Sequence, residues 1–152
     1  MNVFRITRAK YAKDISGTGA RLYGGRWNPK GLAVLYTAES RALAALELLV
    51  HLPPHLLPED IKLITLEVPD DLLVETWLVS ELPQTWRRYP ASDELAAMGE
   101  KWVLSGKSLI LKVPSVIIPQ EFNILINPIH EAFDRVEILT VEDFRIDDRL
   151  VK

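Results

Sequence analysis

The chain has 152 residues, of which 48% are hydrophobic and 26% charged, and its formal net charge is -3. These values are typical of a soluble globular protein, and we expect a single domain over residues 1–152. The absence of cysteine excludes thiolate nucleophiles, disulfides and cysteine-ligated metal sites. The first residues contain no apolar segment typical of a secretion signal, and no window approaches the ~18 consecutive apolar residues of a membrane span. We therefore expect a cytoplasmic protein.

Positive charge is concentrated near the N-terminus. Residues 1–41 contain eight Lys or Arg residues and two acidic residues, which sum to +6, so the rest of the chain sums to -9. A domain with an isoelectric point near 5.6 lacks the broad basic surface that non-specific nucleic-acid binding needs. The pattern favours a small phosphorylated ligand, and we expect no direct binding of nucleic acid.

The first third of the chain predicts two strands separated by a loop, followed by a helix. Residues 2–7 have the alternation of a strand. Residues 15–31 contain five of the seven glycines, which predicts a long irregular loop. Residues 32–37 form an apolar run of strand length. Ser40 is a suitable N-cap for a helix over 41–51, which a pair of prolines then ends.

The rest of the chain predicts short strands and one more helix. A second helix is expected over 93–106, capped by Ser92 or Asp93, and the turn-rich stretch 82–90 before it is expected to be irregular. Strand-like apolar runs occur at 61–68, 73–79 (a short strand or a loop), 108–113, 115–118, 122–126 and 136–144. Because strands and helices do not alternate regularly, we expect an α+β domain and not a doubly wound sheet.

Glu47 stands out because helical spacing places it on the same face as Leu43, Leu46 and Val50, the face that an amphipathic helix buries. A carboxylate there needs a partner. One interpretation is structural: an ion pair with an N-terminal arginine, or a position at the border of the buried face. The other is functional: a carboxylate in a water-poor site that binds sugar hydroxyls and stabilises developing positive charge.

Arg26 lies in GGRWNPKG, where glycines let the backbone approach a ligand and Trp27 offers a flat face. The planar guanidinium group suits phosphate because it donates two parallel hydrogen bonds. Arg5 lies on the first strand, on the opposite side from its two apolar neighbours, and is a candidate for the same site. Alternatively, each arginine is a surface charge, because the glycine-rich stretch matches neither a Walker motif nor GxGxxG.

Other catalytic classes find little support. His51, His55 and His130 do not have the spacing of a metal site, and no GxSxG motif is present, which argues against a Ser/His/Asp hydrolase. Ser115 follows a proline and is either a constrained, projecting hydroxyl or an ordinary strand-edge residue. Tyr36 is expected in the core, with its phenol group needing a hydrogen-bond partner.

Six features follow one another along the chain: an N-terminal arginine and the segments GRWN, LYTAES, ALELLVHL, VPSVIIP and NILINPIH. Together they resemble the RES-domain family. The resemblance covers roughly residues 3 to 145. The family is named for an Arg, a Glu and a Ser, and its members are toxins of bacterial toxin–antitoxin modules. The resemblance implies a fold similar to that of ADP-ribosyltransferase toxins, a split mixed β-sheet with flanking helices around an NAD-binding cleft.

The resemblance also implies roles for individual residues. Arg26, Glu47 and Ser115 match the three family residues; Arg21 competes for the arginine role, and Ser105 or Ser108 for the serine role. Arg26 and Arg5 would hold the pyrophosphate of NAD+, Tyr36 would orient the nicotinamide end, and Ser115 would position the nicotinamide ribose. Glu47 would bind the ribose hydroxyls and stabilise an oxocarbenium-like centre. NAD+ is then the substrate, and no metal is required.

The leading hypothesis is a toxin of a type II toxin–antitoxin system that cleaves the nicotinamide–ribose bond and depletes NAD+ by phosphorolysis or hydrolysis. Its implied partner is a helix-turn-helix (Xre-like) antitoxin that covers the active site. A second hypothesis is mono-ADP-ribosylation of one cellular protein from the same site. A third is a non-catalytic binding module, against which the Glu47 placement argues.

Overall fold

The computed structural model describes residues 1–151. The strands are β1 (Asn2–Arg8), β2 (Leu35–Ala38), β3 (Ile61–Glu67), β4 (Val74–Thr76), β5 (Ile110–Pro114), β6 (Phe122–Ile126) and β7 (Glu137–Asp143). The α-helices are α1 (Thr18–Tyr23), α2 (Arg41–His51) and α3 (Asp93–Ser105). Short 3-10 helices lie at Ala9–Tyr11, Pro54–Leu56, Val79–Glu81, Phe133–Arg135 and Asp148–Val151.

Local sequence signals explain the start of α2 and the end of α3, whereas the Ser92 side chain makes no capping hydrogen bond at the start of α3. Ser40 caps α2 as predicted, since its hydroxyl accepts a hydrogen bond from the Leu43 backbone N–H at 3.0 Å. Gly106 ends α3 in a left-handed conformation, with φ of 63°. The six-residue α1 is a feature that the sequence analysis missed, because the predicted loop over 15–31 includes it.

Two predicted strands differ from the structure. The strand expected at 32–37 starts only at Leu35, and the segment 115–118 is a turn. The turn forms because the Ser115 hydroxyl accepts hydrogen bonds from the backbone N–H groups of Ile117 and Ile118, at 3.1 and 3.2 Å. A side chain that satisfies nearby backbone donors competes with strand pairing.

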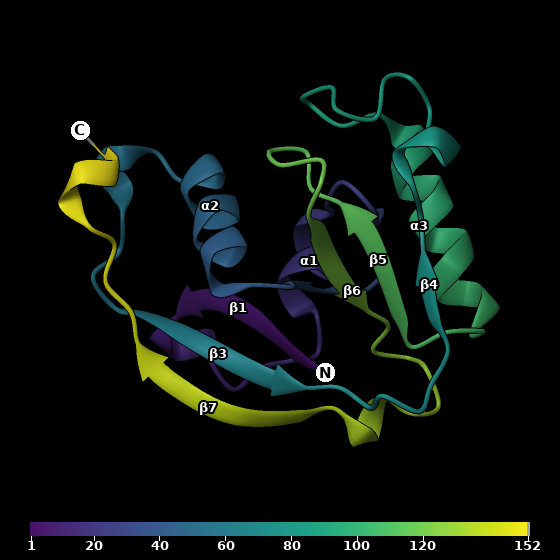
Figure 1. The fold of residues 1–152 in the computed structure, drawn as a ribbon, viewed down its shortest axis with the longest axis horizontal. Coiled ribbons are helices and arrows are strands. Elements are labelled where there is room, and N and C mark those ends of the chain that lie inside the picture. Colours follow the sequence, from purple (N-terminus) through teal and green to yellow (C-terminus); the bar gives the residue numbers. More distant parts are fainter. Residues whose placement is uncertain (152) are drawn as a thin grey trace.

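The seven strands form one sheet in the order β4-β5-β6-β2-β1-β3-β7, in which β4 and β5 are parallel and the other pairs antiparallel. The predicted α+β class and mixed sheet are confirmed. The sheet is continuous, with a narrow junction where β1 and β2 share only the pair Phe4↔Ala38. On either side of this junction, Figure 1 shows β1, β3 and β7 running in a different direction from β5 and β6.

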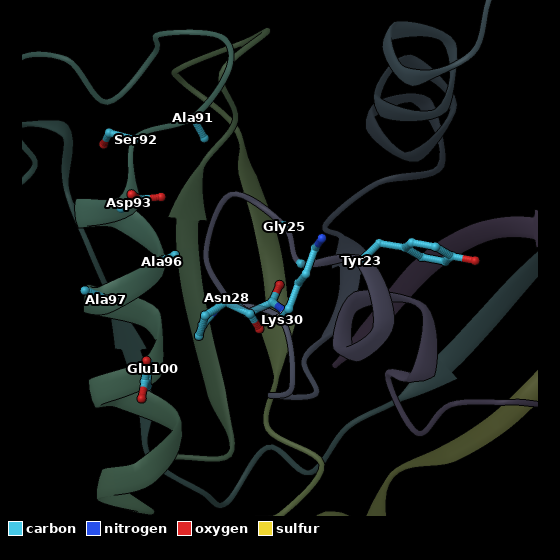
Figure 2. Close-up of a pocket in the computed structure, with 12 residues that line it drawn as sticks. Tyr23, Gly25, Asn28, Lys30, Ala91, Ser92, Asp93, Ala96, Ala97 and Glu100 are labelled. Atoms are coloured by element: carbon cyan, nitrogen blue, oxygen red, sulfur yellow. Dashed lines mark hydrogen bonds between the residues drawn. The ribbon is translucent and has the colours of Figure 1, made fainter.

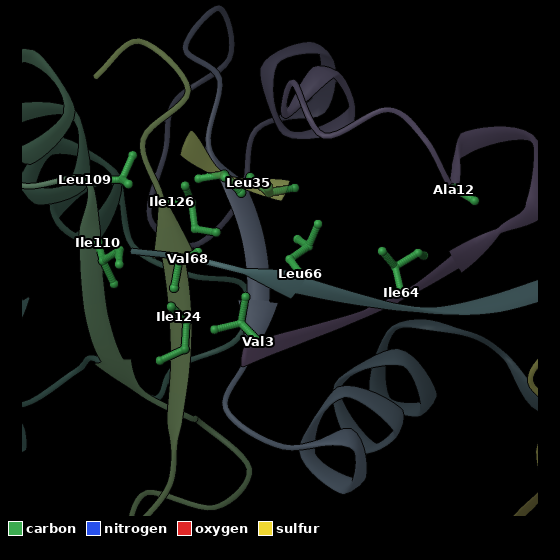
Figure 3. Packing of buried hydrophobic residues seen from close by; sticks show 11 residues of the cluster. Val3, Ala12, Leu35, Ile64, Leu66, Val68, Leu109, Ile110, Ile124 and Ile126 are labelled. Carbon is green, nitrogen blue, oxygen red and sulfur yellow. The ribbon is translucent and has the colours of Figure 1, made fainter. Parts of the chain in front are cut away.

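Apolar side chains cover both faces of the sheet, with a hydrophobic cluster on one face that spans the junction (Figure 3). It includes Val3, Leu35, Ile64, Leu66, Ile110, Ile124 and Ile126. The opposite face packs against the helices: Phe4, Ala38 and Leu63 lie under Leu43 and Ala44 of α2, while Leu111 and Leu125 pack with Leu95 and Trp102 of α3. Two helices thus share one face, each over its own half of the sheet.

Candidate active site

Glu47 lies on α2 at the border of the buried face. Leu43 and Ala44, one turn earlier, are buried, whereas Glu47 is half-buried and Val50 is 61% exposed. The expectation that Val50 shares the buried face is therefore wrong. Figure 1 shows the reason, since α2 starts beside β1 and rises away from the sheet toward its C-terminal end.

The Glu47 carboxylate is held by two neutral donors. The Ser115 hydroxyl donates to Oε1 at 2.8 Å and the Asn123 side-chain amide donates to the same oxygen at 2.7 Å. None of the ion pairs found within residues 1–151 includes Glu47, so the ion-pair interpretation is not the one the structure adopts. The arrangement joins α2 to the end of β5 and the start of β6, elements far apart in the sequence.

Of the three candidate serines, Ser115 is the one beside Glu47. Its side chain is fully buried, with its proton donated to Glu47 and its oxygen accepting from two backbone N–H groups. Ser105 instead donates to the Trp102 carbonyl group, and Ser108 accepts from the Trp102 indole. The structure thus pairs Ser115 with the carboxylate, and its contact with a nicotinamide ribose stays a prediction.

Arg26 belongs to the same electrostatic environment as Glu47. One guanidinium nitrogen, Nη1, donates to the carbonyl oxygens of Trp86 and Arg88 at 2.9 and 3.0 Å, which directs the side chain toward the irregular stretch 82–90. Burial lowers the Arg26 pKa, while the negative charge of Glu47 opposes that shift. Within residues 1–151, hydrogen bonds engage only Nη1 of this guanidinium. The competing Arg21 is exposed on α1.

Tyr36 fastens the Arg26 loop to β2. Its hydroxyl donates to Asn28 Oδ1 at 2.7 Å and accepts from the Trp27 backbone N–H at 3.0 Å, which confirms that the phenol finds a partner. Burial raises the Tyr36 pKa. A Cβ atom on Gly25 would lie 2.7 Å from this hydroxyl, so the loop needs glycine there. Tyr36 therefore positions the loop, and its contact with nicotinamide stays a prediction.

Asn28 organises the Arg26 loop, a role that was not predicted from the sequence. It is 1% exposed, and its amide donates to three backbone carbonyl groups, those of Ala20, Pro29 and Leu32. Asparagine side chains often organise loops in this way. The position within a glycine-rich and proline-containing segment was the only sequence signal for this role.

Trp27 does not offer its ring to a ligand, contrary to expectation. It is 3% exposed and packs against Trp77, with ring centroids 5.6 Å apart. Gly99 of α3 lies directly against it, because a Cβ atom at Gly99 would stand 1.6 Å from the Trp27 carbonyl oxygen. The loop is thus clamped between Tyr36 and α3.

Arg5 lies apart from the other candidates. Arg5 on β1 pairs with Ile64 on β3. The Ile64 side chain belongs to the hydrophobic cluster on the face of the sheet without α2, whereas Phe4 packs under α2 on the other face. Because side chains alternate along a strand, Arg5 is on the opposite face from Glu47. The expectation that it joins Arg26 in one site is therefore wrong. Its guanidinium donates to the Asp14 carbonyl at 2.8 Å, and burial lowers its pKa.

A separate cavity of about 380 Å³ lies between the glycine-rich loop and α3. Its lining includes Gly25, Asn28 and Lys30 from the loop and Asp93 and Glu100 from α3 (Figure 2). Glu47, Arg26 and Ser115 do not line it. The candidate active site defined by Glu47 is therefore distinct from this cavity.

The segment NPIH at 127–130 is a structural turn. The Asn127 amide donates to the Val103 carbonyl at 3.0 Å and accepts from the Ile129 N–H at 3.1 Å, and His130 Nδ1 accepts from the Ala132 N–H. Within residues 1–151, no group of three or more His, Asp or Glu side chains is arranged to hold a metal ion. Over the same part of the chain, no helix has the length and apolar character needed to span a membrane.

Comparisons of the whole chain with known proteins find a matching family and similar proteins. The model of the RES domain matches residues 2–147. The chain is 40% identical to the "Prs ADP-ribosylating toxin" of Sphingobium sp. (strain YBL2), with 95% of this chain and 91% of that protein covered. It is 39% identical to "Toxin Res" of Photorhabdus laumondii, with 100% and 98% covered.

Among solved structures, the fold matches a chain from the crystal structure of the M. tuberculosis MbcT-MbcA toxin-antitoxin complex. The TM-score is 0.75 at 20% sequence identity, and the match covers 99% of this chain and 86% of the other. At this identity the likeness concerns the fold. The match to the family model and the two relatives carry the assignment, and the chain belongs to the RES domain family.

Proposed function

We propose that this protein is the toxin of a toxin–antitoxin pair and that it cleaves the bond between nicotinamide and ribose in NAD+. The observation that carries the proposal is the Glu47 carboxylate, half-buried, held through one oxygen by Ser115 and Asn123 and accompanied by the Arg26 guanidinium. The family and the name of its Sphingobium relative supply the substrate.

In the proposed reaction, the bond from ribose C1′ to the nicotinamide nitrogen breaks and its electron pair leaves with nicotinamide. Positive charge then develops on the ribose, where a fixed carboxylate stabilises it electrostatically. Glu47 suits this role because its two donors are neutral, and none of the ion pairs found within residues 1–151 includes its carboxylate. An oxygen of water or phosphate bonds to C1′ and releases its proton to solvent, which makes the protein an NAD+-cleaving glycosyltransferase.

Arg26 is proposed to bind the pyrophosphate. Its Nη1 is anchored by two carbonyl groups, so the rest of the planar guanidinium is held in place for anionic oxygens. Tyr36 acts through the loop that carries Arg26, and Ser115 acts through Glu47. Arg5 has no part in this proposal because it lies on the other face of the sheet.

A second candidate function uses the same site with a different acceptor. The relative named "Prs ADP-ribosylating toxin" is 40% identical over 147 residues, which favours mono-ADP-ribosylation of a cellular protein. In that reaction a protein side chain takes the place of water or phosphate as the nucleophile at C1′. Glu47 and Arg26 keep the same roles.

The proposed partner is an antitoxin of the helix-turn-helix (Xre-like) type that covers the active site. The fold match to a chain of a toxin–antitoxin complex supports a partner of this general kind. Its contact surface is expected near Glu47 and Arg26, because an inhibitor that covers these residues keeps NAD+ out.

The test is to incubate the purified protein with NAD+ in buffers with and without phosphate, and then with a cell lysate. Nicotinamide release and transfer of labelled ADP-ribose are followed, with Glu47→Gln and Glu47→Ala as matched variants. Release that depends on phosphate or water, without labelled protein, supports NAD+ depletion; one labelled protein band supports the second function. Full activity in both Glu47 variants contradicts either function, and no release by the wild-type protein favours a binding module.

A further inference from the structure

Asn123, the second residue of β6, is a polar side chain to which the sequence analysis assigned no role. Its Nδ2 donates to Glu47 Oε1 at 2.7 Å, and the Ser115 hydroxyl donates to that same oxygen at 2.8 Å. Because a carboxylate carries no hydrogen, the asparagine amide must present its nitrogen here. Within residues 1–151, both hydrogen bonds to this carboxylate go to Oε1, so Oε2 keeps its full acceptor capacity.

The position of Asn123 relative to α2 is fixed by the backbone. Asn123 pairs with Ala38 on β2 and with Val113 on β5. The preceding residue, Phe122, is bound twice to Glu39: its N–H donates to the Glu39 carboxylate at 3.0 Å, and its carbonyl accepts from the Glu39 N–H at 3.2 Å. Since Glu39 directly precedes the N-cap of α2, strand β6 and the helix that carries Glu47 are tied together.

The orientation of the Glu47 carboxylate depends on two hydrogen-bond donors from different segments of the chain. A single hydrogen bond from Ser115 leaves the carboxylate group able to turn about that contact. A second donor, from the planar amide of Asn123, fixes the orientation of the group and therefore the direction of Oε2. The negative charge of Glu47 acts on Arg26 in the neighbouring loop, and Arg26 is itself anchored by two carbonyl groups.

We propose that Asn123 is a positioning residue: with Ser115 it holds Oε1 of Glu47 so that Oε2 meets the ribose of the substrate. This inference rests on the function proposed above and deepens it. Loss of a hydrogen bond to a charged group that serves the transition state lowers the rate about 10- to 100-fold.

The kinetic test compares wild type with Asn123→Ala and Asn123→Asp. We expect Asn123→Ala to lower kcat for nicotinamide release about 10- to 100-fold and to change KM by less than about twofold. Asn2, exposed at the start of β1, supplies the control, because Asn2→Asp adds the same charge away from Glu47 and is expected to leave kcat unchanged. Thermal unfolding confirms that each variant is folded.

Asn123→Asp is expected to change the pH dependence of activity in a way that a merely structural role of Asn123 would not produce. When both carboxyl groups are ionised, the new carboxylate repels Glu47 and no donor replaces the lost amide, so activity is lost. When the two groups share one proton at lower pH, the new carboxyl group donates to Oε1 as the amide did. We expect this variant to gain activity relative to wild type as the pH falls. A pH profile parallel to that of wild type, or a wild-type kcat in Asn123→Ala, overturns the proposal.

An NMR measurement separates this proposal from the function on which it rests. The side-chain amide signal of Asn123 is compared in wild type, Glu47→Gln and Ser115→Ala, with the Asn2 amide signal as reference. We expect the Asn123 signal to shift in both variants and the Asn2 signal to stay. An Asn123 signal that does not move overturns the positioning role, whatever the activity. A wild-type protein that leaves NAD+ intact refutes the proposed function, while the amide signal still decides the hydrogen bond.

Discussion

Replacing Tyr36 by Phe removes one oxygen atom and with it the fastening of the Arg26 loop. The hydroxyl donates to Asn28 Oδ1 and accepts from the Trp27 N–H, so Tyr36→Phe leaves one acceptor and one donor without a partner in a partly buried place. A stranded polar group of this kind costs about 1–3 kcal/mol. We expect Tyr36→Phe to lower the free energy of unfolding at neutral pH by about 2 kcal/mol, or roughly 4–8 °C in Tm for a domain of this size.

The same substitution has a pH signature. Burial holds the Tyr36 pKa above its usual value of 10.0, so the folded protein keeps the phenol neutral while the unfolded chain ionises. The stability that Tyr36 contributes is complete below about pH 10 and is lost as the pH rises further, by about 1.4 kcal/mol per pH unit. The stability difference between wild type and Tyr36→Phe is therefore expected to shrink above pH 10.

Urea unfolding followed by tryptophan fluorescence measures both effects, because Trp27 itself lies in the loop. Nicotinamide release is measured in parallel, and we expect it to fall because the loop that carries Arg26 is loosened. A stability loss below about 0.5 kcal/mol at neutral pH, or a difference that stays constant above pH 10, refutes the fastening role of Tyr36.

Three further predictions concern the loop, α3 and the buried turn. Gly99→Ala is expected to destabilise the protein by about 3 kcal/mol or more, because its Cβ would stand 1.6 Å from the Trp27 carbonyl oxygen. The control is Gly19→Ala, in open space on α1, which is expected to be neutral or stabilising. The urea unfolding midpoints of the two variants are compared. Arg26→Lys is expected to lower kcat/KM for NAD+ at least about tenfold, because an ammonium group lacks the planar fork; an unchanged value would argue against the pyrophosphate role. Asn127→Ala is expected to lower the free energy of unfolding by about 2–3 kcal/mol, since the Val103 carbonyl and Ile129 N–H lose their partner. Calorimetry measures this loss, and a clearly smaller value would contradict the structural role of Asn127.

Much of the candidate site was within reach of the sequence. Glu47 was singled out because a carboxylate on an apolar helix face is unusual, and Arg26 because it lies among glycines. Both lie in one electrostatic environment in the structure. The assignment of Ser115 over Ser105 and Ser108 depended on the family resemblance. In the structure Ser115 is the one of the three that bonds to Glu47, and its role toward the substrate stays a prediction.

Local chemistry determined the elements themselves. The Ser40 cap, the left-handed Gly106 and the alternation in β1 act over a few residues, so the boundaries of α2, α3 and β1 follow from the neighbouring amino acids. The alternation also placed Arg5 opposite Phe4 from the start.

Which of these faces becomes the site was decided only by the tertiary structure. The helix α2 covers the Phe4 side of β1, which leaves Arg5 on the other face, and no local signal specifies that choice. Asn123 reaches Glu47 across 76 positions of sequence, and Ser115 across 68. Hydrogen bonds between segments so distant depend on how β5, β6 and α2 come together in the folded sheet. The sequence thus determined the chemical groups and their local supports, and the packing of α2 on the sheet determined which of them meet.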